Sequence, residues 1–137
     1  MQIALGTDEE APLVAAIEDH LGVLGHSVVR VAPGATWPEV GREVGLAVCR
    51  GTATFGICCC HTGTGVSIAA NKVDGVRAAL CGDAVTASGA RRFNDANVLA
   101  LGLRQTSTAV AIEIVDAFLA GVVDADERSM IDRLEQS

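Results

Sequence analysis

The chain contains very few aromatic residues and prolines. Its 137 residues include three phenylalanines, one tryptophan, no tyrosine and three prolines. The core must therefore be built from alanine, valine, leucine and isoleucine, and half of the residues are hydrophobic. Fifteen glycines beside so few prolines indicate several tight turns between strands and helices rather than a disordered chain.

Long apolar runs and an excess of basic residues are also absent. No apolar stretch approaches the ~18 residues of a membrane-spanning helix, and no export signal is recognisable. The formal charge of −7 and a pI near 4.8 argue against a nucleic-acid backbone or an anionic membrane as partner. We expect a cytoplasmic protein whose single domain, residues 1–137, is long enough to bury its own core.

The five cysteines match neither a secreted disulfide framework nor a metal site. Their number is odd, three are contiguous, no Cys-x-x-Cys pair occurs and the three histidines are scattered, so we expect no metal and no cofactor. Adjacent strand residues face opposite sides, which puts Cys58 and Cys60 on one face and Cys59 on the other. Burial as small apolar residues is the favoured interpretation for all of them except Cys60, which ends its strand.

Strand-like and helix-like segments alternate five times along the chain. Short apolar stretches predict strands at 1–5, 27–31, 55–60, 76–81 and 98–101. Apolar residues at helical spacing predict helices at about 12–24, 40–48, from Ser67 onward, 84–92 and 108–119, followed by a polar tail. This alternation predicts an α/β fold, a three-layer sandwich with a five-stranded parallel sheet between helices.

The most informative segment is the strand 55–60 with the glycine-containing turn that follows it. Gly63 and Gly65 permit close approach of the backbone before a helix begins. Free N–H groups in such a turn form an anion-binding concavity at the positive end of the helix dipole. Cys60 and Thr62 at its edge would add a base and a proton donor for a reaction through an enediolate. Such a turn also serves packing alone, and the spacing leaves both interpretations open.

The expected sheet places several polar residues near one another. Ligands of parallel α/β sheets bind beyond the carboxyl ends of the strands. Asp8 follows the first strand, Cys60 ends the third and Arg104 follows the fifth. We therefore expect these three residues on one edge of the sheet, while Asn94 lies just before the fifth strand.

Four segments and one turn carry a resemblance to a known enzyme family. They are residues 60–72, 75–81, 94–104 and 114–119 and the opening turn Gly6-Thr7-Asp8. Together they closely resemble the type B ribose-5-phosphate isomerase and galactose-6-phosphate isomerase family, over roughly residues 1–120. The combination is far more specific than any single glycine motif.

The resemblance implies an aldose–ketose isomerase that acts on a phosphorylated sugar through a cis-enediolate, on a Rossmann-like fold. In family members with cysteine at the position of Cys60, the thiolate moves the proton between C1 and C2. The residue matching Thr62 handles the proton on oxygen, Asp8 would orient sugar hydroxyls and Arg104 would help bind phosphate.

The resemblance also implies which residues hold the enediolate. They are Gly63, Thr64, Gly65, Val66, Ser67 and Asn94. In the family the two active sites lie at a dimer interface, with tail residues of one subunit reaching the pocket of the other. The expected partners are thus a small sugar phosphate and a second copy of the chain, in a homodimer or higher homo-oligomer. The apolar segment 108–119 suggests an interface as well, unless it simply covers the middle of a sheet face.

The chain departs from the family pattern at several positions. Glu9 stands where the family has a histidine, and Phe93 replaces the ring-opening histidine and cannot transfer a proton. His61 replaces a glycine beside the cysteine, where it either lowers the thiol pKa, shuttles protons or has no role. The C-terminal Gly-Gly-Arg phosphate segment is not recognisable, although Arg128 and Arg133 could replace it in part.

Three functional hypotheses follow from the match and the departures. The first is an isomerase for a substrate that needs no ring opening, such as a short open-chain sugar phosphate; it is favoured because the main site residues survive together. The second is a catalytically degenerate binding or partner subunit of the same fold. The third is a related proton transfer on a ligand without phosphate, since Glu9 and Glu10 would repel an anion.

Overall fold

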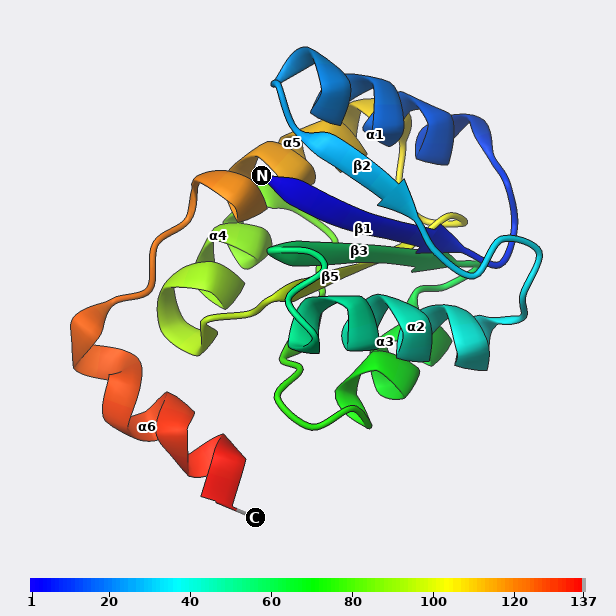
Figure 1. The fold of residues 1–137 in the computed structure, drawn as a ribbon. Helices are drawn as coiled ribbons and strands as arrows, with labels where there is room; N and C mark the ends of the chain where they lie inside the picture. The colour runs from blue at the N-terminus through cyan, green and yellow to red at the C-terminus, as the bar shows by residue number, and fades with distance from the viewer. Residues whose placement is uncertain (137) are drawn as a thin grey trace.

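A five-stranded parallel sheet forms the centre of the molecule (Figure 1). The computed structural model describes residues 1–136. The strands are β1 (Gln2–Thr7), β2 (Ser27–Arg30), β3 (Phe55–Cys60), β4 (Ala78–Leu80) and β5 (Val98–Gly102). Their order is β2-β1-β3-β5-β4, and every neighbouring pair is parallel. The chain leaves β1 toward β2 and returns on the other side at β3, so the switch point lies between β1 and β3.

Helices cover both faces of this sheet. They are α1 (Pro12–Val23), α2 (Trp37–Cys49), α3 (Thr64–Asn71), α4 (Ala84–Asn94) and α5 (Thr108–Ala120). Buried side chains of α1, α4 and α5 form one core with the sheet, and those of α2 and α3 form a second core on the opposite face. The expected three-layer α/β sandwich with a five-stranded parallel sheet is confirmed.

The alternation of side chains along β3 follows the sequence prediction. Cys59 belongs to the core under α1 and α5, whereas Cys58 and Cys60 belong to the core under α2 and α3. Gly56 lies on the same strand, and a Cβ atom there would come within 3.2 Å of a methyl group of Val48. The helix α2 therefore packs very closely on β3.

Two element boundaries differ from the sequence prediction. The helix α3 begins at Thr64 rather than Ser67, because Gly63 caps it in a left-handed conformation with φ of 79°. Strand β4 covers only Ala78–Leu80 rather than 76–81. On its outer edge the side chain of Asn71 accepts a hydrogen bond from the Ala78 N–H at 2.8 Å and donates one to the Ala78 carbonyl at 3.0 Å.

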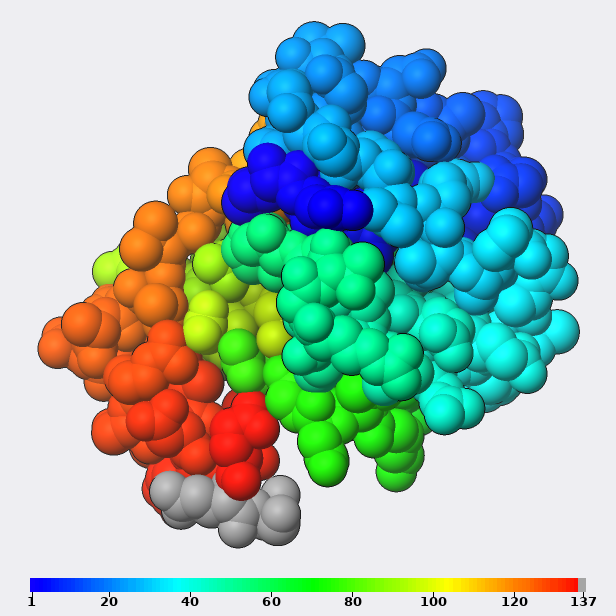
Figure 2. Space-filling view, viewed as in Figure 1, coloured from blue at the N-terminus to red at the C-terminus, as the bar shows by residue number. Residues whose placement is uncertain are grey.

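The polar tail also folds, which the sequence analysis did not anticipate. It forms two 3-10 turns, Ala125–Glu127 and Arg133–Gln136, around the short helix α6 (Arg128–Asp132). Ile131 is buried, and the carboxylate of Glu135 forms an ion pair with Arg77 at 2.9 Å. Figure 2 shows the red tail lying against the green segment that precedes β4.

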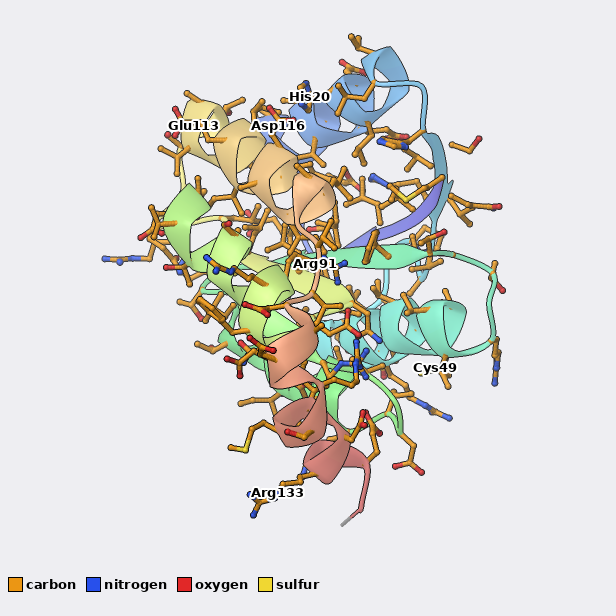
Figure 3. The ribbon with its side chains drawn as sticks, turned by 90° about the vertical axis from the view of Figure 1, so that its left-hand side faces the viewer. His20, Cys49, Arg91, Glu113, Asp116 and Arg133 are labelled. Carbon is orange, nitrogen blue, oxygen red and sulfur yellow. The ribbon has the colours of Figure 1, made fainter. Side chains whose placement is uncertain are left out.

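Three arginines converge on the carboxylate of Asp95, just after α4. Arg91, Arg77 and Arg128 approach it at 3.1, 3.4 and 2.9 Å. Arg91 is largely buried (Figure 3), and its guanidinium carbon lies 4.5 Å from the ring centroid of Phe55. One carboxylate thus joins α4, the segment before β4 and the tail.

Four apolar residues of α5 are buried within the chain, and Val110, Ala117 and Leu119 are partly buried against the same core. The buried ones are Ala111, Ile114, Val115 and Phe118. Glu113 and Asp116 face outward, and Asp116 contacts His20 of α1 at 2.6 Å (Figure 3). The segment 108–119 therefore packs on a sheet face, which is the alternative to an interface that the sequence left open.

Burial of three thiols predicts a loss of stability at alkaline pH. Removal from water raises the pKa of Cys59 to about 12 and that of Cys81 to about 11, and raises the pKa of Cys58 well above its ordinary value of 9.0. Such thiols contribute stability below pH 9.0, and this contribution falls as pH rises because only the unfolded chain ionises.

Urea unfolding at a series of pH values tests this prediction. The free energy of unfolding should fall above about pH 9 by about 1.4 kcal/mol per pH unit for each such thiol. The chain has no tyrosine and a single lysine, so few other groups titrate there. Replacing Cys59 by Ala should reduce the slope, and a stability that stays flat into this range contradicts the prediction.

Candidate active site

A cavity of about 410 Å³ opens at the carboxyl edge of the sheet, at the switch point between β1 and β3. It is lined by Asp8, Trp37, Cys60, His61, Thr62, Thr64, Gly65 and Ile68. Thr7 of β1 pairs in register with Cys59 of β3, which brings the next residues, Asp8 and Cys60, to the same edge. The four candidate catalytic residues therefore line one cavity.

Cys60 is the one cysteine of β3 that reaches this cavity. Its side chain is 5% exposed, whereas Cys58 and Cys59 are fully enclosed. Burial holds the pKa of those two thiols above the ordinary range, so they stay protonated at neutral pH. Of the three cysteines on this strand, only Cys60 presents its sulfur to a ligand in the cavity.

The turn after Cys60 presents backbone donors to the cavity. Helix α3 starts at Thr64, and the N–H groups of its first turn have no partner within the helix. Thr64 and Gly65 line the cavity, and the hydroxyls of Thr62 and Thr64 are 2.9 Å apart. Gln105 fixes the turn by donating a hydrogen bond to the carbonyl of Thr62 at 2.8 Å. The arrangement suits an oxygen that becomes negative during reaction.

Val66 and Ser67 contribute through their backbone. The side chain of Val66 is buried in the core under α2 and α3, and Ser67 is half-buried. The N–H of Ser67 is used within the helix, where it bonds the Gly63 carbonyl at 3.2 Å. Within the expected anion-binding segment, the backbone N–H groups of residues 64–66 therefore remain available to bind an anion.

Trp37 and Ile68 also line the cavity, and the sequence analysis gave neither a role. The sequence predicts that this helix begins at about residue 40, but α2 begins at Trp37. A helix that follows a parallel strand begins at the carboxyl edge of the sheet, so this position was a usable signal. Ile68 lies one turn after Thr64 on the face of α3 toward the cavity.

Arg104 lies near the cavity without lining it. Its N–H donates a hydrogen bond to the carbonyl of His61 at 2.8 Å, and its side chain is exposed. Phe93 and Asn94 end α4 at the opposite edge of the sheet, where Asn94 lines a hollow of about 610 Å³ together with Arg77 and Glu135. A single chain therefore does not bring Asn94 or Phe93 to Cys60.

The remaining charged candidates are engaged elsewhere. Glu10 pairs with Arg30, which also contacts Glu18 at 3.5 Å. Arg128 contacts Asp95 in the tail, and Arg133 contacts the sulfur of Met130 at 3.7 Å. The repulsion expected from Glu10 is thus offset by its partner.

Two further searches concern the described residues alone. Within 1–136, no three His, Cys, Asp or Glu side chains are grouped so that they could hold a metal ion. No helix in that part of the chain has the length and apolar character needed to cross a membrane.

Known proteins resemble this chain along nearly its whole length. A family model described as Ribose/Galactose Isomerase matches residues 3–136. Ribose-5-phosphate isomerase B of Escherichia coli (strain K12) is 40% identical over 117 residues, 74% of this chain and 78% of that protein. D-erythrulose-4-phosphate isomerase of Pectobacterium atrosepticum is 38% identical over 125 residues, 87% of this chain and 82% of that protein.

Solved structures agree with these sequence matches. Ribose-5-phosphate isomerase B of Clostridium thermocellum superposes with a TM-score of 0.94 at 34% identity, covering 99% of this chain and 96% of that one. The Mycoplasma genitalium protein with bound ribulose-5-phosphate gives 0.92 at 33% identity, with 98% and 94% covered. The chain therefore belongs to the ribose/galactose isomerase family.

Proposed function

We propose that the chain is an aldose–ketose isomerase for a short phosphorylated sugar, with Cys60 as the base that acts on carbon. The observation that carries the proposal is one cavity in which the Cys60 thiol meets Asp8, Thr62 and the free N–H groups at the start of α3. Membership of a sugar isomerase family supports it.

The proposed reaction moves one proton between neighbouring carbons. The Cys60 thiolate removes the proton from C2 of the aldose, and the negative charge that develops on O1 is held by the α3 N–H groups. Thr62 relays the hydroxyl proton from O2 to O1, and the Cys60 thiol returns its proton to C1. Asp8 orients the sugar hydroxyls. Protons and electrons balance within the substrate, so the step needs no redox partner.

A four-carbon substrate fits the departures from the family pattern. The terminal hydroxyl of a tetrose 4-phosphate carries the phosphate, so no hydroxyl remains to close a five- or six-membered ring. Such a sugar is open-chain, so its isomerisation does not need the ring-opening histidine that Phe93 replaces. Similarity to D-erythrulose-4-phosphate isomerase over 87% of the chain supports this choice.

A homodimer is part of the proposal, because Phe93 and Asn94 lie far from Cys60 in one chain. Large apolar side chains are exposed on neighbouring elements instead of α5. They are Ile68 on α3, Leu80 on β4, and Val85 and Phe93 on α4. A second copy that covers this surface would bury them and could bring the end of α4 to a cavity.

Replacing Cys60 by Ser should abolish isomerisation. A serine hydroxyl is far less acidic than a thiol, so it stays protonated near neutral pH and cannot act as the base that removes a proton from carbon. We expect loss of about 10³-fold or more in kcat, and loss of deuterium exchange from solvent into D-erythrulose 4-phosphate. Cys58 to Ala, on the same face of β3, is the matched control and should retain exchange. Turnover by the Cys60 variant at the rate of the control would refute the assignment.

Replacing Phe93 by His should restore ring opening for cyclic substrates. The wild-type chain should convert ribose 5-phosphate slowly, at a rate limited by spontaneous opening, and the variant should convert it faster. Activity on the open-chain tetrose phosphate should change little in the same variant. Fast wild-type turnover of ribose 5-phosphate would show that another group opens the ring, and His61, which lines the cavity, would be the first candidate.

Replacing Arg104 by Ala should weaken binding of the phosphate. A charge-assisted contact is worth about 1.5–3 kcal/mol, so KM should rise about ten- to a hundredfold with little change in kcat. Arg50 to Ala, an exposed arginine that caps the C-terminus of α2, is the control. A KM equal to that of the control, or equal losses for phosphorylated and free sugars, would exclude Arg104 from phosphate binding.

A further inference from the structure

We infer that Trp37 sets the length of the sugar phosphate that the Cys60 cavity accepts. The inference rests on the proposed isomerase function and adds a residue that determines substrate size. Trp37 is the single tryptophan of the chain and stands at the first position of α2.

The indole forms a partition between two hollows. On one side lies the Cys60 cavity of about 410 Å³. On the other side lies a hollow of about 400 Å³ that is lined by Trp37, Pro38, Arg42, Ile68, Ala69, Lys72 and Val73. Trp37 and Ile68 are the residues that line both, so their side chains separate the two spaces.

The backbone of α3 holds this partition in place. A Cβ atom at Gly65 would lie 2.8 Å from Cδ2 and Cε3 of the indole, so the ring rests directly on the glycine. A Cβ atom at Gly41 would lie 2.6 Å from the Val66 carbonyl oxygen, which shows how closely α2 and α3 approach. The ring is 45% exposed, yet packing on one side fixes its position.

The chemistry of the second hollow indicates what would enter if the partition were removed. Arg42 and Lys72 line it, whereas no arginine or lysine lines the Cys60 cavity among the described residues. A longer sugar whose reacting carbons lie at Cys60 and whose chain extends past Trp37 would bring its phosphate to these two cations instead of to Arg104. With the indole present, the extra carbon of such a sugar meets the ring. The wild-type cavity therefore favours the four-carbon substrate.

Two ketose phosphates separate chain length from ring opening. Neither D-erythrulose 4-phosphate nor D-ribulose 5-phosphate has a free terminal hydroxyl that can close a five- or six-membered ring, so both are open-chain. The difference of one carbon is worth about 10–200-fold in a fitted pocket. In Trp37→Ala, the ratio of kcat/KM for the five-carbon over the four-carbon substrate should rise about tenfold or more.

Three further variants control this measurement. Trp37→Phe keeps a ring on Gly65 and should leave the ratio near the wild-type value. Trp37→Leu keeps the apolar contact with a shorter side chain and should shift the ratio in the same direction as Ala, which covers the case that the Ala variant does not fold. Val23→Ala removes an apolar side chain that is 85% exposed at the end of α1 and should change neither rate.

The fluorescence of Trp37 gives a readout that is independent of turnover. Because the chain has one tryptophan and no tyrosine, its indole emission reports this position alone. D-erythrulose 4-phosphate should change the emission saturably in the wild type and in Cys60→Ser, which keeps the cavity but lacks the base. An unchanged emission at concentrations that saturate turnover would overturn the placement of Trp37 at the substrate.

The outcomes distinguish the inference from the function on which it rests. Wild-type turnover with an unchanged substrate ratio in both Trp37→Ala and Trp37→Leu overturns the partition and leaves the isomerase proposal intact. No wild-type turnover of either ketose phosphate overturns the isomerase proposal. In that case, the affinities of wild type and Trp37→Leu for the two ketose phosphates are measured by calorimetry. The role of Trp37 as a partition stands if the ratio of the two affinities differs between the proteins, and it fails if the ratio is the same.

Discussion

The site depends on the left-handed backbone of Gly63. This residue turns the chain from β3 into α3 within three residues, and a Cβ atom there would lie 2.6 Å from a methyl carbon of Leu80 and 2.8 Å from the Gly102 nitrogen. A side chain would thus push the turn away from β5. The position of the first α3 N–H groups relative to Cys60 follows from this packing, as does the contact of Gly65 with Trp37.

The layered α/β fold could be predicted from sequence because strands and helices alternate and β3 places its cysteines by a strict two-residue period. Asp8 and Cys60 could be placed on one edge because parallel strands end together. The residues at which helices and strands begin and end were harder to predict. Gly63 looked like one more turn residue, and its role as the cap of α3 depends on contacts with β5 that are remote in sequence.

Other parts of the candidate site could not be derived from one chain's pattern. The role of Trp37 depends on the tight approach of α2 to α3 at Gly41, which no local propensity encodes. The sequence pattern predicted no helix in the polar tail, yet the tail contains α6 and is tied to the rest of the chain by ion pairs of Arg77 and Arg128. The choice between an interface and a sheet face for the apolar run of α5 could not be made from composition, because it depends on contacts with α1, α4 and the sheet.

The side chain of Asn71 has a consequence for how copies of this chain can meet. By occupying both outer hydrogen-bonding groups of Ala78, it closes the first position of the three-residue edge strand β4 to another strand. Edge strands blunted in this way resist β-sheet extension and the aggregation that follows from it. A second molecule that approached β4 would find no free hydrogen-bonding groups at Ala78, which disfavours extension of the five-stranded sheet by pairing with this strand.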